Sequence, residues 1–155
     1  MLKLLNLKTS YLNKNIINDI LKLKDTHWKK GLTSQKKYFN KNINKNDHHI
    51  LMYYKNIFVG YVLLRNKKCK FKRKSTQYYH FDTFIVKKKF RKLKLSNFLM
   101  DFIKNFISFE KSLSILFCEV KVVKYYKKFG WKKIDDKNVV LNLDKPKYKK
   151  ILYFK

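Results

Sequence analysis

The sequence is poor in cysteine and in residues that interrupt a chain. Among 155 residues it has three glycines, one proline, two cysteines and no alanine. Without a Gly-, Pro- or Ser-rich stretch there is no sign of a linker, and we expect one domain over residues 1–155. The cysteines, Cys69 and Cys118, stand in different contexts, so a reduced, cytoplasmic protein is the default. No signal peptide or membrane-length apolar run is found, so no membrane partner is expected.

Acidic residues and arginine are also scarce. Ten Asp and Glu stand against 39 Lys and Arg, a formal net charge of +29, and only three of the basic residues are arginine. Depletion of Arg, Gly, Pro and Ala beside abundant Lys, Asn, Ile and Phe is typical of an AT-rich coding sequence, which explains much of the lysine. Glutamate also has AT-rich codons yet occurs twice, so part of the charge is left unexplained. Few arginines argue against sequence-specific base recognition, although non-specific attraction to polyanions is expected.

Apolar and aromatic side chains are plentiful, and their spacing changes near the middle of the chain. Phe81–Val86 has the β-branched and aromatic composition of a buried strand. From Leu95 onward the apolar residues recur with helical spacing, which predicts a helix beginning there. Its apolar stripe consists of Leu95, Phe98, Leu99, Phe102, Ile103, Phe106 and Ile107.

A basic loop joins this strand to this helix. Six of its eight residues, Lys87–Lys94, are Lys or Arg. The start of the helix directs unpaired N–H groups and the positive end of the helix dipole at the same place, and that combination binds phosphate. A charge run alone is more often a solvated turn, so its position before a helix is what favours a phosphate site.

The stretch from Val86 to Leu99 resembles the acetyl-CoA loop of the GNAT superfamily of N-acetyltransferases. In that family a strand ending in Val is followed by [RQ]-x-x-G-x-[GA] and a helix. Arg91 takes the [RQ] position and Ser96 the last small position. Lys94 stands where the first glycine belongs, and its Cβ would narrow the approach of the backbone to a pyrophosphate.

A second stretch resembles the other GNAT signature, a strand followed by a short helix with Y-x-x-x-G-[FW]. The apolar run Ser112–Cys118 precedes Tyr126, which takes the Tyr position, and Gly130-Trp131 completes the pattern. The two signatures occur in the family's order and at a family-like separation. The resemblance covers most of the chain, rests mainly on residues 80–131, and implies acetyl-CoA as co-substrate and an amine as acceptor.

The whole pattern fits an α/β fold with one GNAT-like mixed central sheet flanked by helices. Residues 77–86 and 113–119 are predicted as central strands, parallel because a helix joins them, and the resemblance implies that they splay apart around pantetheine. The other expected elements are a strand at 2–8, helices at 11–24 and 34–42 capped by Thr9 or Ser10 and by Ser34, a hairpin of strands 49–54 and 57–65, an exposed basic loop at 66–74, a helix around Tyr126 and a closing strand pair at 139–143 and 151–154.

The resemblance assigns the binding of acetyl-CoA mainly to backbone groups. Those at the strand end would pair with the pantetheine amides, and those of the loop would hold the pyrophosphate, with lysines adding charge. The segment joining the first two helices would line the acceptor pocket, although simple packing or solvent exposure there is the more frequent outcome. The residues so implied are Phe84, Ile85, Val86, Arg91, Lys92, Leu93, Lys94, Leu95, Ser96 and Asn97 for acetyl-CoA, and His27 and Trp28 for the acceptor.

Acetyl transfer to an amine needs an acid for the leaving thiolate and a base for the amine. The resemblance gives Tyr126 the role of acid, although as one of eleven tyrosines it is also a candidate core residue. His80 and Asp82 share one face of the central strand by alternation, and Glu119 ends the neighbouring strand. Each of the three is a candidate base, and the sequence does not choose among them.

The sequence also bears on three other classes of site and function. The adjacent His48 and His49 would face opposite sides of a strand without further ligands, so no metal site is expected. A basic nucleic-acid-binding module would explain the charge but not the two signatures. A catalytically inactive GNAT-fold binding protein would explain the missing loop glycine. The sequence indicates neither the acceptor nor the oligomeric state.

Overall fold

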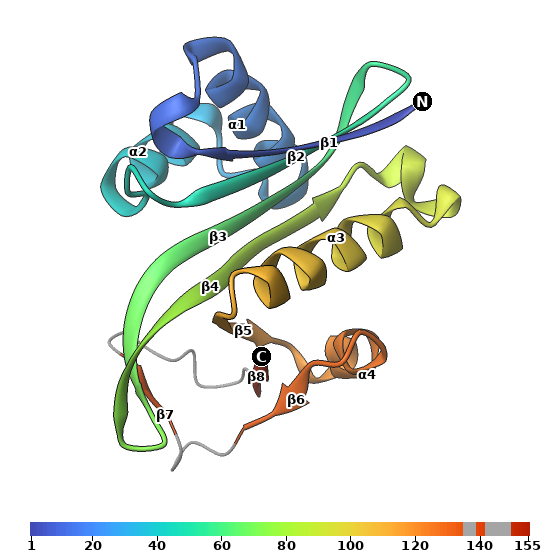
Figure 1. The fold of residues 1–155 in the computed structure, drawn as a ribbon. Coiled ribbons are helices and arrows are strands. Elements are labelled where there is room, and N and C mark those ends of the chain that lie inside the picture. Colours follow the sequence, from blue (N-terminus) through green and yellow to red (C-terminus); the bar gives the residue numbers. More distant parts are fainter. Residues whose placement is uncertain (135–138, 142–149) are drawn as a thin grey trace. The chain divides into compact units, whose positions relative to one another are not determined.

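The structure is a computed structural model that describes residues 1–134, 139–141 and 150–155 (Figure 1). Its internal contacts divide the chain into two compact units. The first consists of Met1–Arg65 and Thr83–Leu99, and the second of Asn66–Asp82 and Met100–Lys155. Because each unit is assembled from two separate stretches, neither corresponds to a simple half of the sequence.

Strands of the first unit follow the order β1-β2-β3-β4, and α1 packs on them. The core between helix and sheet is formed by Ile20 and Leu23 of α1 with Leu51, Tyr61, Leu63 and Ile85. The elements that contribute to this unit are β1 (Leu2–Lys8), the 3-10 helix η1 (Thr9–Tyr11), α1 (Lys14–Trp28), α2 (Leu32–Asn42), β2 (His48–Tyr54), the first part of β3 (Ile57–Phe71), the end of β4 (Lys74–Val86), the 3-10 helix η2 (Lys88–Leu93) and the start of α3 (Leu95–Phe109).

Both N-terminal helices exist as predicted, but their caps differ. Asn13, rather than Thr9 or Ser10, caps α1, because its side chain accepts a hydrogen bond of 2.9 Å from a first-turn N–H. The two predicted caps lie in η1, where their own N–H groups donate to carbonyls before β2. Gly31, at a φ of 80°, precedes α2, which therefore begins two residues before Ser34.

The predicted hairpin of β2 and β3 is confirmed. The two strands are antiparallel, and the connecting residues Lys55 and Asn56 have φ values of 49° and 61°. Positive φ at both central residues is the geometry of a type I′ turn, which matches the twist of the flanking strands.

The prediction of an exposed loop over residues 66–74 is wrong. β3 runs on to Phe71, a second two-residue turn at Lys72-Arg73 has φ values of 48° and 67°, and β4 begins at Lys74. Cys69 is only 4% exposed, whereas the lysines on either side of it face solvent. The exposed positions of this strand are nearly all basic. The run of basic residues therefore masked the alternation of buried and exposed positions that is typical of a strand.

Strands of the second unit follow the order β4-β5-β8-β6, and β7 pairs with β3. The predicted parallel pairing is confirmed, since Tyr78–His80 of β4 lies opposite Leu113–Ile115 of β5. Ser114 joins the two strands further, because its hydroxyl donates to the Tyr79 carbonyl at 2.9 Å. The further elements of this unit are β5 (Leu113–Cys118), the 3-10 helix η3 (Val120–Val122), α4 (Val123–Lys128), β6 (Lys132–Lys133), β7 (Val139–Leu141) and β8 (Lys150–Phe154).

The predicted closing pair does not form from the two C-terminal strands. β7 pairs with residues 69–71 of β3, whereas β8 lies between β5 and β6 and is antiparallel to both. Ile151 and Leu152 of β8 are buried, as suits a strand with neighbours on both sides. Residues 142–143 of the prediction lie outside the described part of the chain.

Candidate active site

The basic loop begins where the last strand of the first unit ends. Residues Lys88–Leu93 form η2, and α3 begins at the buried Leu95. Lys94 between them has a φ of 53°, in the left-handed region that glycine adopts at least cost. The structure therefore supplies a second reason for a glycine here, besides close approach, and the lysine occupies the position with some backbone strain.

The end of β4 offers alternate backbone groups to opposite edges. The N–H of Lys87 donates to the Val59 carbonyl of β3 at 2.8 Å. Strand alternation then directs the backbone groups of Ile85 toward β3 as well, and those of Phe84 and Val86 toward the other edge. On that edge, the Val86 carbonyl accepts a hydrogen bond from Nε of Arg91 at 3.2 Å, which ties the loop to the strand.

A glycine that the sequence analysis passed over lies beside this strand end. An added Cβ at Gly60 of β3 would lie 3.3 Å from the Ile85 carbonyl and 3.4 Å from Leu99. Glycine inside a strand often marks such a close approach, so this signal could have been found in the sequence.

A pocket of about 330 Å³ adjoins the loop and is lined entirely by the first unit. It places His27, at the end of α1, next to Ile85, Val86 and Arg91, so one predicted acceptor residue meets three predicted cofactor residues. Its lining residues in the described part of the chain include no carboxylate. They are Thr26, His27, Ile85, Val86, Lys87, Lys88, Lys89 and Arg91.

Trp28 is 39% exposed and packs edge-on against His27, with 4.8 Å between ring centroids. The ammonium group of Lys24 lies 5.7 Å from the Trp28 ring and 4.7 Å from the Tyr38 ring. A cation at such a distance from the face of an aromatic ring is attracted to the ring. Lys24 is only 4% exposed, so little water weakens this attraction. Contacts with Lys24 and His27 thus hold Trp28 beside the pocket, but Trp28 is not among the residues that line it.

The predicted acid, Tyr126, lies on α4 of the second unit within an aromatic cluster. Its ring centroid is 6.1 Å from that of Phe81, 6.2 Å from Trp131 and 5.5 Å from Tyr125. Burial, and to a lesser degree Cys118 and Tyr125, raises the pKa of the Tyr126 hydroxyl well above its usual value of 10. The hydroxyl therefore keeps its proton throughout the neutral range.

The glycine of the second signature has a clear structural reason. Gly130 has a φ of 85°, and an added Cβ would lie 3.3 Å from the Phe154 ring. Trp131, next in the chain, is 1% exposed and contacts Phe81 and Phe154. The glycine thus allows the turn that returns the chain from α4 into the core of this unit.

The three candidate bases lie in different surroundings within the second unit. His80 is 8% exposed and contacts the Phe117 ring at 5.4 Å. Asp82, two residues along β4, is half-buried. Glu119 is mostly exposed and forms an ion pair with Lys121 at 2.6 Å. His80 and Asp82 are therefore less exposed to solvent than Glu119.

No group of three or more His, Cys, Asp or Glu that could hold a metal ion occurs within residues 1–134, 139–141 and 150–155. His49 is buried and uses both ring nitrogens, one with the Tyr61 hydroxyl at 2.8 Å and the other with the Thr9 hydroxyl at 2.9 Å. Its role is structural, within the polar interior of the first unit.

A basic loop that leads into a helix, beside a strand with backbone groups on one edge, is an arrangement that can bind phosphate groups. The sequence model of the Acetyltransferase (GNAT) domain matches residues 15–152, and this chain belongs to that family. No curated protein sequence matches the chain closely enough to be a relative. Among the described residues, no helix is long and apolar enough to cross a membrane.

Solved structures show the same fold at low sequence identity. Escherichia coli ElaA has a TM-score of 0.73 at 14% identity, covering 100% of both chains. Arabidopsis thaliana Naa50, in complex with the bisubstrate analogue CoA-Ac-MVNAL, has a TM-score of 0.68 at 18% identity, covering 99% of this chain and 98% of its own. Bacillus subtilis N-acetyltransferase YlbP, in complex with coenzyme A, has a TM-score of 0.63 at 16% identity, covering 99% and 96%. The fold is therefore that of the GNAT N-acetyltransferases.

Proposed function

We propose that this protein is an N-acetyltransferase that moves the acetyl group of acetyl-CoA directly to an amine. Family membership supports acyl transfer in general. The observation that carries the finer proposal is the pocket of about 330 Å³ in which His27 of α1 meets the strand end and the basic loop. Structural neighbours bound to coenzyme A and to a bisubstrate analogue support CoA as the acetyl carrier.

Acetyl-CoA would be held by backbone groups at the strand end and by charge in the loop. Phe84 and Val86, whose backbone groups face away from β3, are better suited than Ile85 to pair with pantetheine amides. In the loop the N–H groups of Lys94 and Asn97 already donate to the Arg91 and Lys94 carbonyls, at 3.1 and 2.9 Å. Lysine side chains therefore carry much of the pyrophosphate binding in this proposal, together with the remaining N–H groups of 92–96.

The reaction forms a C–N bond and breaks a C–S bond. Tyr126 donates its proton to the leaving sulfur, and its raised pKa keeps that proton available at neutral pH. Burial weakens the phenol as an acid, but it also raises the pKa of a buried thiol, and this offsets part of the unfavourable difference in acidity. The tyrosinate then regains a proton from solvent, and the products are an amide and free CoA thiol.

The amine must be neutral before it attacks and must lose a proton afterwards. Either His80 or Asp82 accepts this proton, directly or through water, and Glu119 is the third candidate. In this proposal His27 lines the acceptor side of the pocket, and Trp28 supports it from beside the pocket. The basic residues around the pocket favour an acceptor that carries negative charge near its amine over a polycation.

Calorimetry tests the cofactor part of the proposal. We expect about one site for acetyl-CoA and loss of most of the affinity for acetyl-pantetheine, which lacks the phosphates. The double variant Lys88→Gln, Lys89→Gln should weaken binding about tenfold, because both lysines line the pocket. Lys37→Gln with Lys41→Gln, on the exposed side of α2, is the control with an equal loss of charge. Equal binding of ATP and acetyl-CoA would contradict a specific site.

Thiol release from acetyl-CoA, followed across a panel of amines, tests the transfer and identifies the acceptor class. Thiol release that depends on one class of amine supports the proposal that the protein is an acetyltransferase. Binding of acetyl-CoA with no release on any amine would instead favour a catalytically inactive GNAT-fold binding protein.

A further inference from the structure

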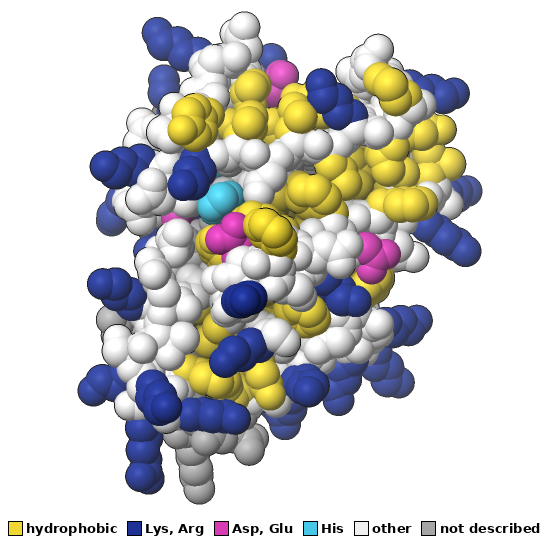
Figure 2. All heavy atoms as spheres, in the orientation of Figure 1, with side chains coloured by type: hydrophobic (Ala, Val, Ile, Leu, Met, Phe, Trp, Pro, Cys, Tyr) yellow, Lys and Arg dark blue, Asp and Glu magenta, His cyan; other side chains and the backbone are white. Residues whose placement is uncertain are grey.

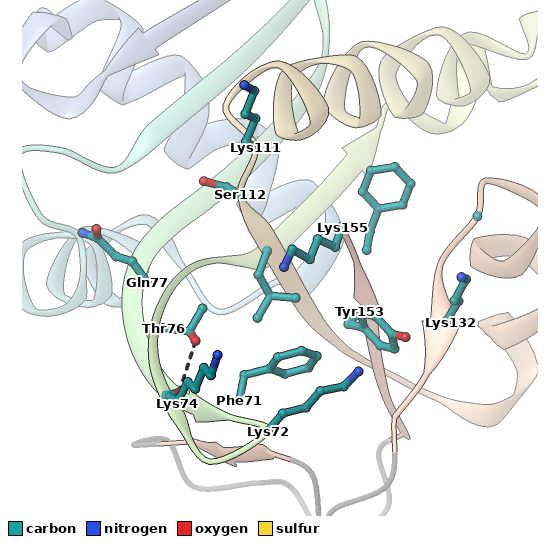
Figure 3. A pocket seen from close by; sticks show the side chains of 13 residues that line it. Phe71, Lys72, Lys74, Thr76, Gln77, Lys111, Ser112, Lys132, Tyr153 and Lys155 are labelled. Atoms are coloured by element: carbon teal, nitrogen blue, oxygen red, sulfur yellow. Dashed lines mark hydrogen bonds between the residues drawn. The ribbon is translucent and has the colours of Figure 1, made fainter.

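The second unit contains a pocket of about 730 Å³ to which the proposed reaction assigns no role (Figure 3). It opens at the N-terminal ends of the parallel strands β4 and β5, whereas Cys118, Glu119 and α4 follow the C-terminal end of β5. None of the candidate catalytic residues lines it. The residues that do are Phe71, Lys72, Lys74, Thr76, Gln77, Lys111, Ser112, Leu113, Gly130, Lys132, Tyr153, Phe154 and Lys155.

Positive charge converges on this pocket from separate parts of the sequence. Lys72 comes from the turn between β3 and β4, Lys74 from the start of β4, Lys111 from the turn after α3, and Lys132 from β6. The described lining residues include no Asp or Glu, and no described carboxylate forms an ion pair with these four lysines.

Aromatic rings form the apolar part of the same pocket. The rings of Phe71 and Tyr153 pack with 5.7 Å between centroids, and the Lys72 ammonium lies 5.7 Å from the Phe71 ring. Figure 3 shows these two rings at the base of the pocket with the Lys72 and Lys74 side chains around them. Aromatic rings beside ammonium groups offer stacking surfaces for bases and partners for phosphates at once.

The positive surface continues beyond the pocket along the turn of β3 and β4. Lys68 and Lys70 occupy alternate exposed positions of β3, and Lys72 and Arg73 follow in the turn. A mononucleotide would use the pocket alone, whereas an extended polyanion would use the pocket and this row of charges together. The net charge of +29 favours the extended ligand as well.

We infer that this pocket and the adjoining turn bind single-stranded nucleic acid. Lysines contact successive phosphates, and one or two bases stack on Phe71 and Tyr153. A duplex keeps its bases stacked on each other and does not offer them to the rings, so the site discriminates by strandedness and not by sequence. The scarcity of arginine agrees with the lack of base-edge recognition.

Fluorescence anisotropy with a labelled single-stranded DNA oligonucleotide of about 12 nucleotides, measured over a range of salt, tests this inference. The triple variant Lys74→Gln, Lys111→Gln, Lys132→Gln should lower the slope of log affinity against log salt by about 2 and the low-salt affinity at least about tenfold. Its control has the same net charge: Lys37→Gln, Lys41→Gln, Lys45→Gln, all exposed in the first unit. The control should keep most of the slope.

Stacking is tested by Tyr153→Leu, which should weaken binding of the single strand about tenfold while binding of the same sequence as a duplex changes little. Phe109→Leu removes a ring that is 84% exposed outside the pocket and serves as control. Thermal melting of each variant shows whether it is folded. If Tyr153→Leu does not fold, the lysine variants by themselves test the inference. Equal losses in the two triple variants, or equal affinity for polyglutamate of matched charge, would overturn the inference.

Discussion

The interiors of the two units contain side chains of different kinds. The first encloses the charged side chains of Lys24, Asp47 and Arg65 together with His49. The second encloses an aromatic cluster around Trp131, to which Tyr126 belongs. Figure 2 shows that Lys and Arg side chains are widespread over the face that it draws.

Burial shifts the pKa of His49 in the first unit and of Tyr126 in the second, with opposite consequences for pH. In the first unit, burial, followed by the nearby charges of His48 and Lys24, lowers the pKa of His49 from 6.5 to about 3. In the second, burial raises the pKa of Tyr126 above its usual value of 10. Both groups are neutral at pH 7, so the first unit is sensitive to acid and the second to alkali.

The largest expected effect is the acid sensitivity caused by His49. Above pH 6.5 the ring is neutral in the folded and unfolded states and contributes nothing. Between pH 6.5 and 3 the unfolded state binds a proton that the folded state does not, so stability falls as pH falls. From pH 7 to about pH 4.5 this loss amounts to about 3 kcal/mol. Urea unfolding at the two pH values should show a smaller loss in His49→Gln, which retains a hydrogen-bonding side chain.

His27→Gln is the control for that measurement, because His27 is exposed on α1. It should keep the acid sensitivity of the unmodified protein. Hydrogen exchange on peptides of β2 and β5 then locates the loss, which we expect in β2 first. If the stability of His49→Gln depended on pH as that of the unmodified protein does, His49 would not be the cause of the acid sensitivity, and the contrast between the units would be wrong.

The second effect is catalytic and concerns the aromatic interior. Tyr126→Phe should lower turnover by about 10² or more and leave acetyl-CoA affinity nearly unchanged, because the ring stays and only the proton is lost. Since burial raises the pKa of Tyr126, its ionisation should not lower the rate of the unmodified enzyme between about pH 8 and 10.

Tyr125→Phe, one position earlier on α4, is the matched control and should retain activity. Steady-state rates with the amine found by the thiol-release screen, together with calorimetry of acetyl-CoA, measure both quantities. Unmodified rates in Tyr126→Phe would leave water or another group as the proton source.

The smallest expected effect sets backbone strain against charge at one residue of the loop. Lys94→Gly should raise stability by about 1 kcal/mol, because a lysine at a φ of 53° is strained where glycine is not. The same change should weaken acetyl-CoA binding severalfold, because a charge is lost from a loop that relies on lysine. Lys94→Gln separates the two effects, since it removes the charge and keeps the strain. Tighter binding in the glycine variant would show that close approach outweighs charge.

Local patterns were enough for the elements that carry the family signatures. The helical stripe from Leu95 predicted α3 and the residue at which it begins, and Tyr126 and Gly130 predicted α4 and the turn after it. Each of these signals consists of residues that are close in sequence and act through backbone geometry or one helix face. The roles of the site residues remain predictions, because binding and turnover measure them and a fold does not.

What the sequence by itself determined was therefore the α/β class, the parallel strand pair and the identity of the basic loop. Only the tertiary structure decided that residues 66–74 form a hairpin, that β8 lies between β5 and β6, and that His27 adjoins the loop. It also decided the lysine pocket, because Lys72, Lys111 and Lys132 belong to different elements. Strand neighbours and convergent charges are contacts between residues far apart in sequence. These contacts depend on which faces of whole helices and strands become buried against each other, and the spacing of residues within one segment does not predict that.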